Sequence, residues 1–337
     1  MRILIFFLIS VCFASCDSNN NPFVYQKDAH GRGKTHLYVE ESFKPLFTTC
    51  IETFMSQYPK ASIKAIYSAE DQIIEAFYRN KTKTIVITRD FNDEEKAFLK
   101  SKNVSYRSDK IATDAVVLIM HPTMADTVLS IAQIKSLLSN NNTKLPSGQS
   151  ITQIVFDQKG SANFNFMTNM LGINQLADRV SALNSNEEVI NYVKSHPGTI
   201  GLIGLNWIAD QDDPTSMAFM DGLRIAAVYQ DKPQNAYKPY AGMIYTKEYP
   251  LIRDIWVINK GRRSGLNTGF VLFMKKDDKG QLIIQKSAAS KVRVLEIGSN
   301  DGSLIKNFNK KNVICVEPCK NLAIITKNKG FKTYDDY

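Results

Sequence analysis

The feature that most constrains the fold is an alternation of short apolar segments with helical patterns, which begins at residue 36. "HLYVE" reads as a strand, and in the helix that follows it Leu46, Phe47, Cys50, Ile51, Phe54 and Met55 recur at helical spacing. Further strand candidates are "SIKAIYS", "KTIVITRD", "IATDAVVLIMHP", "ITQIVFD" and "TIGLIGLNWI". Helical patterns separate most of them, which predicts an α/β fold with mixed, mainly parallel sheets.

Two local expectations accompany this pattern. Ser68 and Asp71 have the spacing of a capping box, which predicts a helix that starts beside Ser68. Near the end of the alternation, "TGFVLFMKKDDKGQLIIQKSAA" reads as two helices that are broken near Gly280.

The first sixteen residues, "MRILIFFLISVCFASC", have one basic residue and an apolar run that is too short for a permanent membrane helix. The ending Phe-Ala-Ser-Cys resembles a bacterial lipobox, which implies export and lipid attachment at Cys16. Residues 17–34 would then be a polar tether between the membrane and the folded protein. The alternative is an ordinary cleaved signal peptide in which the cysteine is incidental.

Composition limits the function classes. A chain of 337 residues can form two domains, and its net charge of +9 is spread along the chain without an aromatic-interleaved basic patch, which disfavours nucleic-acid binding. The excess charge is compatible with an anionic ligand or membrane surface. Five cysteines give no disulfide framework, and four histidines lack partners at metal or triad spacing, so neither a metal nor a catalytic set is predicted.

Three predicted strands end in polar turns that open helices, and in open α/β sheets ligands bind at that edge. Ser42, Thr88 and Ser161 stand in these turns. Helix N-termini carry unsatisfied N–H groups, and each hydroxyl would add a donor for a tetrahedral oxyanion. Taken one by one, the same residues could equally be helix caps.

In order along the chain, "YVEESFKPLFTTCIETFMSQYPKASI", "IVITRDFNDEE", "ATDAVVLIMHP", "IVFDQKGSANFNFM", "HPGTIGLIGLNWI" and "TGFVLFMKKDDKGQLIIQKS" resemble the phosphate-binding lipoproteins of ABC transporters. The resemblance covers roughly residues 35–288. It implies a two-lobed periplasmic-binding-protein fold that closes on its ligand. Lobe 1 would comprise about 35–112 and 235–289, and lobe 2 about 113–234, with hinge crossings near 111–118 and 225–240.

By this resemblance the ligand-binding residues are Ser42, Thr88, Arg89, Ser161 and Asn163. The Gly-Thr that follows the matching serine in the family is replaced here by Ala162-Asn163. Asp157 stands where many members carry an anion-pairing arginine, and Arg89 lies where others place an acid. The ligand is therefore phosphate or a similar oxyanion. Asp114 is a weaker candidate, since a structural role at the hinge explains it as well.

A second resemblance begins at residue 292. "VLEIGSNDGSL" followed by "VEPCKNLA" is similar to the first motif of class I S-adenosylmethionine-dependent methyltransferases, especially C-methyltransferases of nucleotide-linked sugars. The resemblance assigns cofactor contacts to Glu296, Gly298, Gly302 and Glu317. Residues 290–337 would form only a truncated Rossmann-like βαβ fragment, too short to be active alone. We expect two unrelated coding pieces joined at about residue 289.

The main hypothesis from the sequence is a lipid-anchored solute-binding protein that captures phosphate or a similar oxyanion for an ABC transporter permease, with no cofactor and no turnover. One alternative is an S-adenosylmethionine-dependent methyltransferase, truncated or chimeric. Another is a cell-surface binding module without a transporter.

Overall fold

The computed structural model describes residues 28–140, 144–288, 294–303, 305, 310 and 313–335. In this part of the chain the largest sheet has nine strands in the order β2-β1-β3-β11-β4-β8-β6-β7, with β9 beside β4. Its members are β1 (Arg32–Glu40), β2 (Lys60–Ser68), β3 (Thr84–Ile87), β4 (Arg107–Met120), β6 (Gln153–Phe156), β7 (Val180–Ala182), β8 (Thr199–Gly204), β9 (Arg224–Ile225) and β11 (Ile252–Asn259). Two smaller sheets consist of β5 (Val128–Ser130) with β10 (Ala227–Tyr229), and of β12 (Val294–Ile297), β13 (Val313–Val316) and β14 (Lys332–Tyr334).

Helices connect most of these strands, as the alternating pattern predicts. The α-helices are α1 (Lys44–Gln57), α2 (Glu70–Tyr78), α3 (Asp93–Ser101), α4 (Ile131–Ser139), α5 (Ala162–Leu171), α6 (Asn186–Ser195), α7 (Pro214–Met220), α8 (Ala241–Tyr245), α9 (Leu266–Lys276), α10 (Asp278–Ala288) and α11 (Lys320–Asn328). Short 3-10 helices include η1 (Glu41–Phe43), η2 (Leu205–Trp207) and η3 (Pro233–Asn235). The predicted α/β class is confirmed.

The large sheet is parallel at both ends and antiparallel in its middle. β1 pairs in parallel with β2 and β3, and β6 pairs in parallel with β7 and β8. Between them β11 runs antiparallel to β3 and β4, and β4 runs antiparallel to β8. The first part of β4, up to Ala115, pairs with β11, whereas Val116–Met120 pair with β8. One strand therefore belongs to both halves of the sheet.

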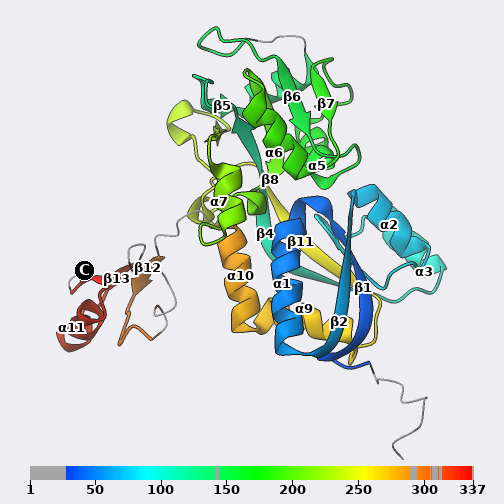
Figure 1. Cartoon of the computed structure of the whole chain (residues 1–337), viewed down its shortest axis with the longest axis vertical. Coiled ribbons are helices and arrows are strands. Elements are labelled where there is room, and N and C mark those ends of the chain that lie inside the picture. The colour runs from blue at the N-terminus through cyan, green and yellow to red at the C-terminus, as the bar shows by residue number, and fades with distance from the viewer. Residues whose placement is uncertain are drawn as a thin grey trace, which may run out of the picture.

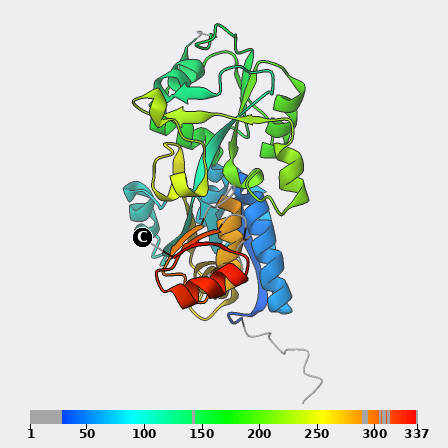
Figure 2. The same cartoon turned by 90° about the vertical axis from the view of Figure 1, so that its left-hand side faces the viewer.

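Two halves of the molecule have separate cores. The first lobe contains β1, β2, β3, β11, α1, α9 and α10, and its core includes Phe47, Phe54 and Phe270. The second lobe contains β6, β8, α4 and α6, and its core includes Ile119 and Val189. Figures 1 and 2 show the halves one above the other, with β4 and β11 running between them. This arrangement is consistent with the two-lobed fold that the resemblance implies.

The chain returns to the first lobe close to Leu251. The sequence placed this second crossing at 225–240, but β10 pairs with β5, and Ile244, Tyr249 and Leu251 are buried in the core of the second lobe. The Tyr249 hydroxyl donates a hydrogen bond of 2.9 Å to the carbonyl of Val116, which lies at the other crossing. Residues up to 251 therefore pack with the second lobe, because their apolar side chains find their partners there. The exact lobe bounds stay a prediction.

Of the two local expectations, the break between two helices near Gly280 is confirmed, and the helix cap at Ser68 is wrong. Ser68 is the last residue of β2, where it pairs with Glu40, and α2 starts after Ala69 without a side-chain cap. The strand pairing therefore takes Ser68 away from the cap position. The helix break lies at Asp277, and Gly280 is inside α10. A Cβ atom on Gly280 would lie 2.3 Å from the Phe273 carbonyl oxygen, so this glycine permits close packing of α10 on α9.

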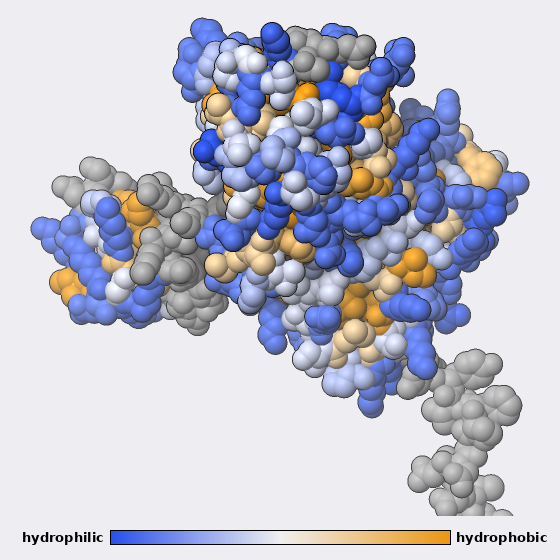
Figure 3. Space-filling view, turned by 45° about the horizontal axis from the view of Figure 1, so that its top comes forward, coloured by the Kyte–Doolittle hydropathy of each residue, from blue (hydrophilic) through white to orange (hydrophobic). Residues whose placement is uncertain are grey.

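Hydrophilic residues cover most of the described surface in the view of Figure 3, with scattered apolar side chains between them. Among the described residues, the structure contains no helix with the length and apolar character needed to span a bilayer. The signal-like segment, Cys16 and most of the tether lie outside the described residues.

The aromatic core of the first lobe gives a stability prediction. Phe54 packs edge-on against Phe270 and Phe273, with ring centroids 5.4 Å apart in both pairs, and it is 1% exposed. We expect Phe54→Ala to lower the free energy of unfolding by about 3–5 kcal/mol in urea denaturation, because it leaves a cavity. Phe98→Ala is the control, since Phe98 is 44% exposed, and a comparable loss there would contradict the assignment.

Candidate functional site

Ser42, Ser161 and Asn163 lie in one buried network between the two lobes. Ser42 is in η1, which follows β1 directly. Ser161 is the N-cap of α5, and its hydroxyl accepts a hydrogen bond from the Phe164 amide. All three residues have no exposed surface. The structure therefore brings together predicted residues from turns that are far apart in the sequence, at the strand ends where the fold class places ligands.

The carboxylate of Glu40, the last residue of β1, lies at the centre of this network. One of its oxygens accepts hydrogen bonds from the Ser42 amide, at 2.8 Å, and from the Ser42 hydroxyl. The other accepts one of 3.1 Å from the amide of Ala162, the first residue of α5. Such helix N-terminal amides have no partner within the helix and favour anions. The three donors thus form a site that suits an oxyanion, and the protein's own Glu40 carboxyl group occupies it.

Asp157 supports this site from the second lobe. It accepts hydrogen bonds from the Ser161 hydroxyl, at 2.6 Å, and from the side-chain amides of Asn163 and Asn186, at 3.1 Å each. Asn186 also donates to the Glu41 carboxylate and accepts from the Gly204 amide at 3.0 Å. Asp157 therefore acts as an acceptor that fixes the orientation of its neighbours.

Arg253 of β11 supplies the positive charge of the network. Its Nη2 atom donates to Asp114 at 3.0 Å and to the Ser42 hydroxyl at 2.8 Å, and its side chain is 1% exposed. The guanidinium carbon lies 5.0 Å from the centre of the Phe43 ring. Among the described residues, its Nη1 atom has no hydrogen-bond partner. A buried guanidinium with a spare donor is well suited to an oxyanion.

Burial controls the protonation of these acids. It raises the pKa of Glu40 to about 8, and the charge of Asp157 adds to the increase. It raises the pKa of Asp157 to about 7, against hydrogen bonds that lower it. Burial also raises the pKa of Glu41 and of Asp114, and for Asp114 the charge of Arg253 opposes the change. Burial therefore moves the titration of Glu40 and Asp157 toward neutral pH.

Thr88 and Arg89, the other predicted ligands, bind two other carboxylates, those of Glu70 and Glu95. The amide and hydroxyl of Thr88 donate to Glu70 at 3.1 and 2.6 Å. The Arg89 guanidinium makes two hydrogen bonds to Glu95, of 2.6 and 2.9 Å, and lies 3.4 Å from Glu70. These donors are committed to acids of α2 and α3, so a ligand role for either residue stays a prediction.

Several residues of the network were not predicted from the sequence. Glu40 ends an apolar strand, and its exceptional burial was not anticipated. Arg253 alternates with Ile255 and Val257 in β11, all three buried, so the period-two pattern could have indicated an inward-facing arginine. Asn186 and Asn206 carried no signal that distinguishes them from other polar turn residues. The carboxamide of Asn206 donates to the Ser42 carbonyl at 2.6 Å, across the lobes.

The C-terminal segment forms the small parallel sheet of β12, β13 and β14. Glu296 lies in β12, and Gly298 and Gly302 have φ of +72° and +75°, which favours glycine in this turn. Glu317 follows β13 and accepts a hydrogen bond of 2.7 Å from the Asn300 amide. The turn and the acid are thus adjacent, but the methyltransferase resemblance stays a prediction.

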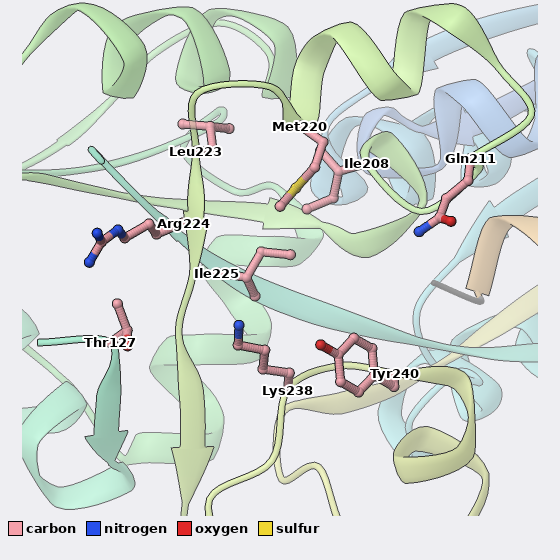
Figure 4. A pocket seen from close by; sticks show the side chains of 9 residues that line it. All are labelled: Thr127, Ile208, Gln211, Met220, Leu223, Arg224, Ile225, Lys238 and Tyr240. Carbon is pink, nitrogen blue, oxygen red and sulfur yellow. The ribbon is translucent and has the colours of Figure 1, made fainter. Parts of the chain in front are cut away.

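A pocket of about 480 Å³ lies in the second lobe, apart from the network around Glu40. Figure 4 shows its lining, with the cations of Arg224 and Lys238 beside apolar side chains. The residues that line it are Thr127, Ile208, Gln211, Met220, Leu223, Arg224, Ile225, Lys238 and Tyr240. None of the predicted ligand-binding residues is among them. Within the part of the chain that the structure describes, no cluster of three or more His, Cys, Asp or Glu could hold a metal ion.

Comparison with known proteins identifies the family of the chain and solved structures with a similar fold. Residues 26–278 match the model of the PBP superfamily domain, so the chain belongs to this family of periplasmic-binding-protein-like domains. A phosphate ABC transporter substrate-binding protein from Clostridium perfringens, solved with bound phosphate, is 18% identical with a TM-score of 0.63, and the match covers 77% of this chain and 100% of that one. An ABC-type phosphate transport receptor from Vibrio cholerae is 14% identical with a TM-score of 0.56, covering 75% and 98%. No curated protein matches the sequence.

The buried ion pair gives the next prediction. Arg253→Met leaves the Asp114 carboxylate buried without its partner, and we expect this to lower the free energy of unfolding by about 3–5 kcal/mol at pH 8. Lys275→Met, which breaks the more exposed 2.7 Å pair with Asp109, is the control and should cost about 1 kcal/mol or less. Urea denaturation measures both, and equal losses would contradict a special role for Arg253.

The raised pKa values predict how stability changes with pH. Between the ordinary carboxyl pKa near 4 and the folded values of about 7 and 8, the folded state binds more protons than the unfolded state. The contribution of Glu40 and Asp157 to stability is therefore greatest at low pH and decreases as the pH rises to about 8. Urea unfolding at pH 5.5, 7 and 8.5 should show a smaller pH dependence for Asp157→Asn than for the wild type. If the free energy of unfolding changed equally with pH in the wild type and in Asp157→Asn, the prediction would be contradicted.

Proposed function

We propose that the chain is a solute-binding protein that captures phosphate or a similar oxyanion between its lobes. The observation that carries the proposal is the hydrogen bonding of the Glu40 carboxylate by the Ser42 amide, the Ser42 hydroxyl and the Ala162 amide. A carboxylate is itself an oxyanion, so these donors already have the positions and charge preference that an oxyanion ligand requires. Binding and release need no chemical step.

The donors belong to both lobes, so one ligand bound by them can hold the two lobes together in a closed form. Ser42 belongs to the first lobe, while Ala162 starts a helix of the second. Arg253 lies on β11, next to the crossing, and its Nη1 atom is a spare donor among the described residues. An oxyanion bound by these groups would contact both lobes at once and so favour the closed form over an open one.

The similar structures support phosphate as the ligand class. The proteins from Clostridium perfringens and Vibrio cholerae are described as phosphate ABC transport proteins, and the former holds phosphate. By analogy, an ABC transporter permease is the partner that receives the solute. Export and lipid attachment at Cys16 complete this proposal, since they would hold the protein at the membrane beside the permease.

The alternative, S-adenosylmethionine binding by residues 292–337, is supported by the adjacency of the glycine turn and Glu317. It is independent of the site between the lobes. Calorimetric titration of the full chain with S-adenosylmethionine separates the two, because a phosphate-binding protein gains nothing from this cofactor. Binding that is lost in Glu317→Ala would favour the alternative.

The proposal predicts selective stabilisation by phosphate. Phosphate at about 1,000 times its dissociation constant should stabilise the folded chain by roughly 4 kcal/mol, and raise the Tm by several degrees above that in phosphate-free buffer. Sulfate at the same concentration is the control ligand. Ser42→Ala should weaken phosphate binding at least tenfold, since it removes one donor, about 1.5 kcal/mol or more for a charged partner.

Thr49→Ala is the matched control, because the Thr49 hydroxyl is exposed and bonds to Pro45 within α1. It should bind phosphate as the wild type does. A Tm that rises with neither anion, or equally for Ser42→Ala and the wild type, would contradict the proposal.

A further inference from the structure

We infer that Glu40 is an internal occupant of the oxyanion site: an external oxyanion binds by displacing this carboxylate from Ser42 and Ala162, and the displaced group takes up a proton. The inference rests on the proposed function and deepens it, because it adds a competitor within the chain and a coupled proton. It makes Glu40 a determinant of affinity and of its dependence on pH.

Competition follows from the hydrogen bonds. The Ser42 amide and hydroxyl donate to one Glu40 oxygen and the Ala162 amide to the other. Each N–H group supplies a single hydrogen, so a ligand oxygen that takes this donor must replace the Glu40 oxygen. Ligand and carboxylate therefore cannot both be fully bound at this site. The Nη1 atom of Arg253, unpartnered in the described part of the chain, is the donor that a ligand gains without displacement.

The same carboxylate bridges the lobes. Its contacts with Ser42 stay within the first lobe, whereas its contact with Ala162 reaches α5 of the second. Glu40 has no exposed surface, and it starts η1 as its N-cap residue. Glu40 thus contacts both lobes, as a bound ligand would. A ligand must make more favourable contacts than this intramolecular bridge. The free energy needed to break the bridge lowers the apparent affinity for the ligand.

Proton uptake follows from the charges around Glu40. Asp157 faces it from the loop before α5, Glu41 adjoins it in η1, and Arg253 faces it from β11. Asp114 of β4 already uses the guanidinium of Arg253. The buried cluster thus holds four carboxylates and a single guanidinium. A further anion adds negative charge to a site where burial already disfavours it, so a proton on the displaced Glu40 restores the balance.

The pH dependence has a definite sign. At low pH Glu40 is protonated, and a neutral carboxyl group competes weakly for N–H donors. At high pH its carboxylate competes strongly. The oxyanion affinity should therefore fall as the pH rises from 5.5 to 9. In Glu40→Gln the side chain keeps its size but has one acceptor oxygen and an NH2 group, which cannot accept from an amide. This variant lacks the titrating competitor.

The experiment is isothermal titration of the full chain with inorganic phosphate at pH 5.5, 7 and 9, for the wild type and Glu40→Gln. The ratio of their dissociation constants at each pH cancels the protonation of phosphate itself. We expect the variant to bind at least tenfold more tightly at pH 9 and about equally at pH 5.5. The control is Glu75→Gln, whose exposed pair with Arg79 lies outside the site and should leave the affinity unchanged.

The proton is measured by repeating the titrations at pH 8.5 in two buffers of different ionisation enthalpy. The wild type should take up more protons per phosphate than Glu40→Gln. If Glu40→Gln fails to fold, Glu40→Asp replaces it, since the shorter side chain cannot bridge Ser42 and Ala162. A ratio that does not change with pH, or weaker binding by the variant throughout, overturns this inference alone. No phosphate binding by any form at millimolar concentration overturns the proposed function as well.

Discussion

The buried pair of Arg253 and Asp114 is the interaction on which the rest of the structure depends. It joins β11 to β4, the two strands that run between the lobes, at the point where the chain crosses. A buried charge is tolerated only when it is paired and hydrogen-bonded, and here the pair also directs a donor to Ser42. The same guanidinium therefore stabilises the junction of the lobes and sets the charge of the candidate site.

The cluster around that pair is unusual because it contains more acids than one guanidinium can neutralise. Proteins usually avoid such an excess, since desolvation and mutual repulsion both oppose ionisation. Hydrogen bonds from Ser161, Asn163 and Asn186 compensate Asp157, and the helix N-terminus at Ala162 compensates Glu40. Buried carboxyl groups with raised pKa values are frequently found at functional sites. The chemistry proposed for this protein is therefore exchange of ligand and proton without covalent change.

Sequence reasoning placed Ser42 and Ser161 in turns that are expected to meet at one edge of a sheet, and the family resemblance added Asn163. The structure brings these three residues together, and their ligand role stays a prediction. Sequence reasoning did not locate Glu40 or Arg253, for different physical reasons. The carboxylate of Glu40 depends on the direction of a single side chain at the end of β1, which no local pattern specifies. Arg253 depends on pairing between β11 and β4, whose residues are some 139 positions apart in the chain. Thr88 and Arg89 resemble ligand residues in sequence, yet in the fold they bind the acids of α2 and α3.

The sequence by itself determined the order of strands and helices and the α/β class, because apolar periodicity and turn residues act over short distances. The family followed from the resemblance of its ordered motifs to known proteins. The tertiary structure decided which polar side chains meet, and where the chain returns to the first lobe. It also decided that α10 packs closely on α9 at Gly280, just after the break at Asp277. The physical reason is that a buried polar group must find its partner wherever the fold brings one, and here Arg253 meets Ser42 across 211 positions of sequence.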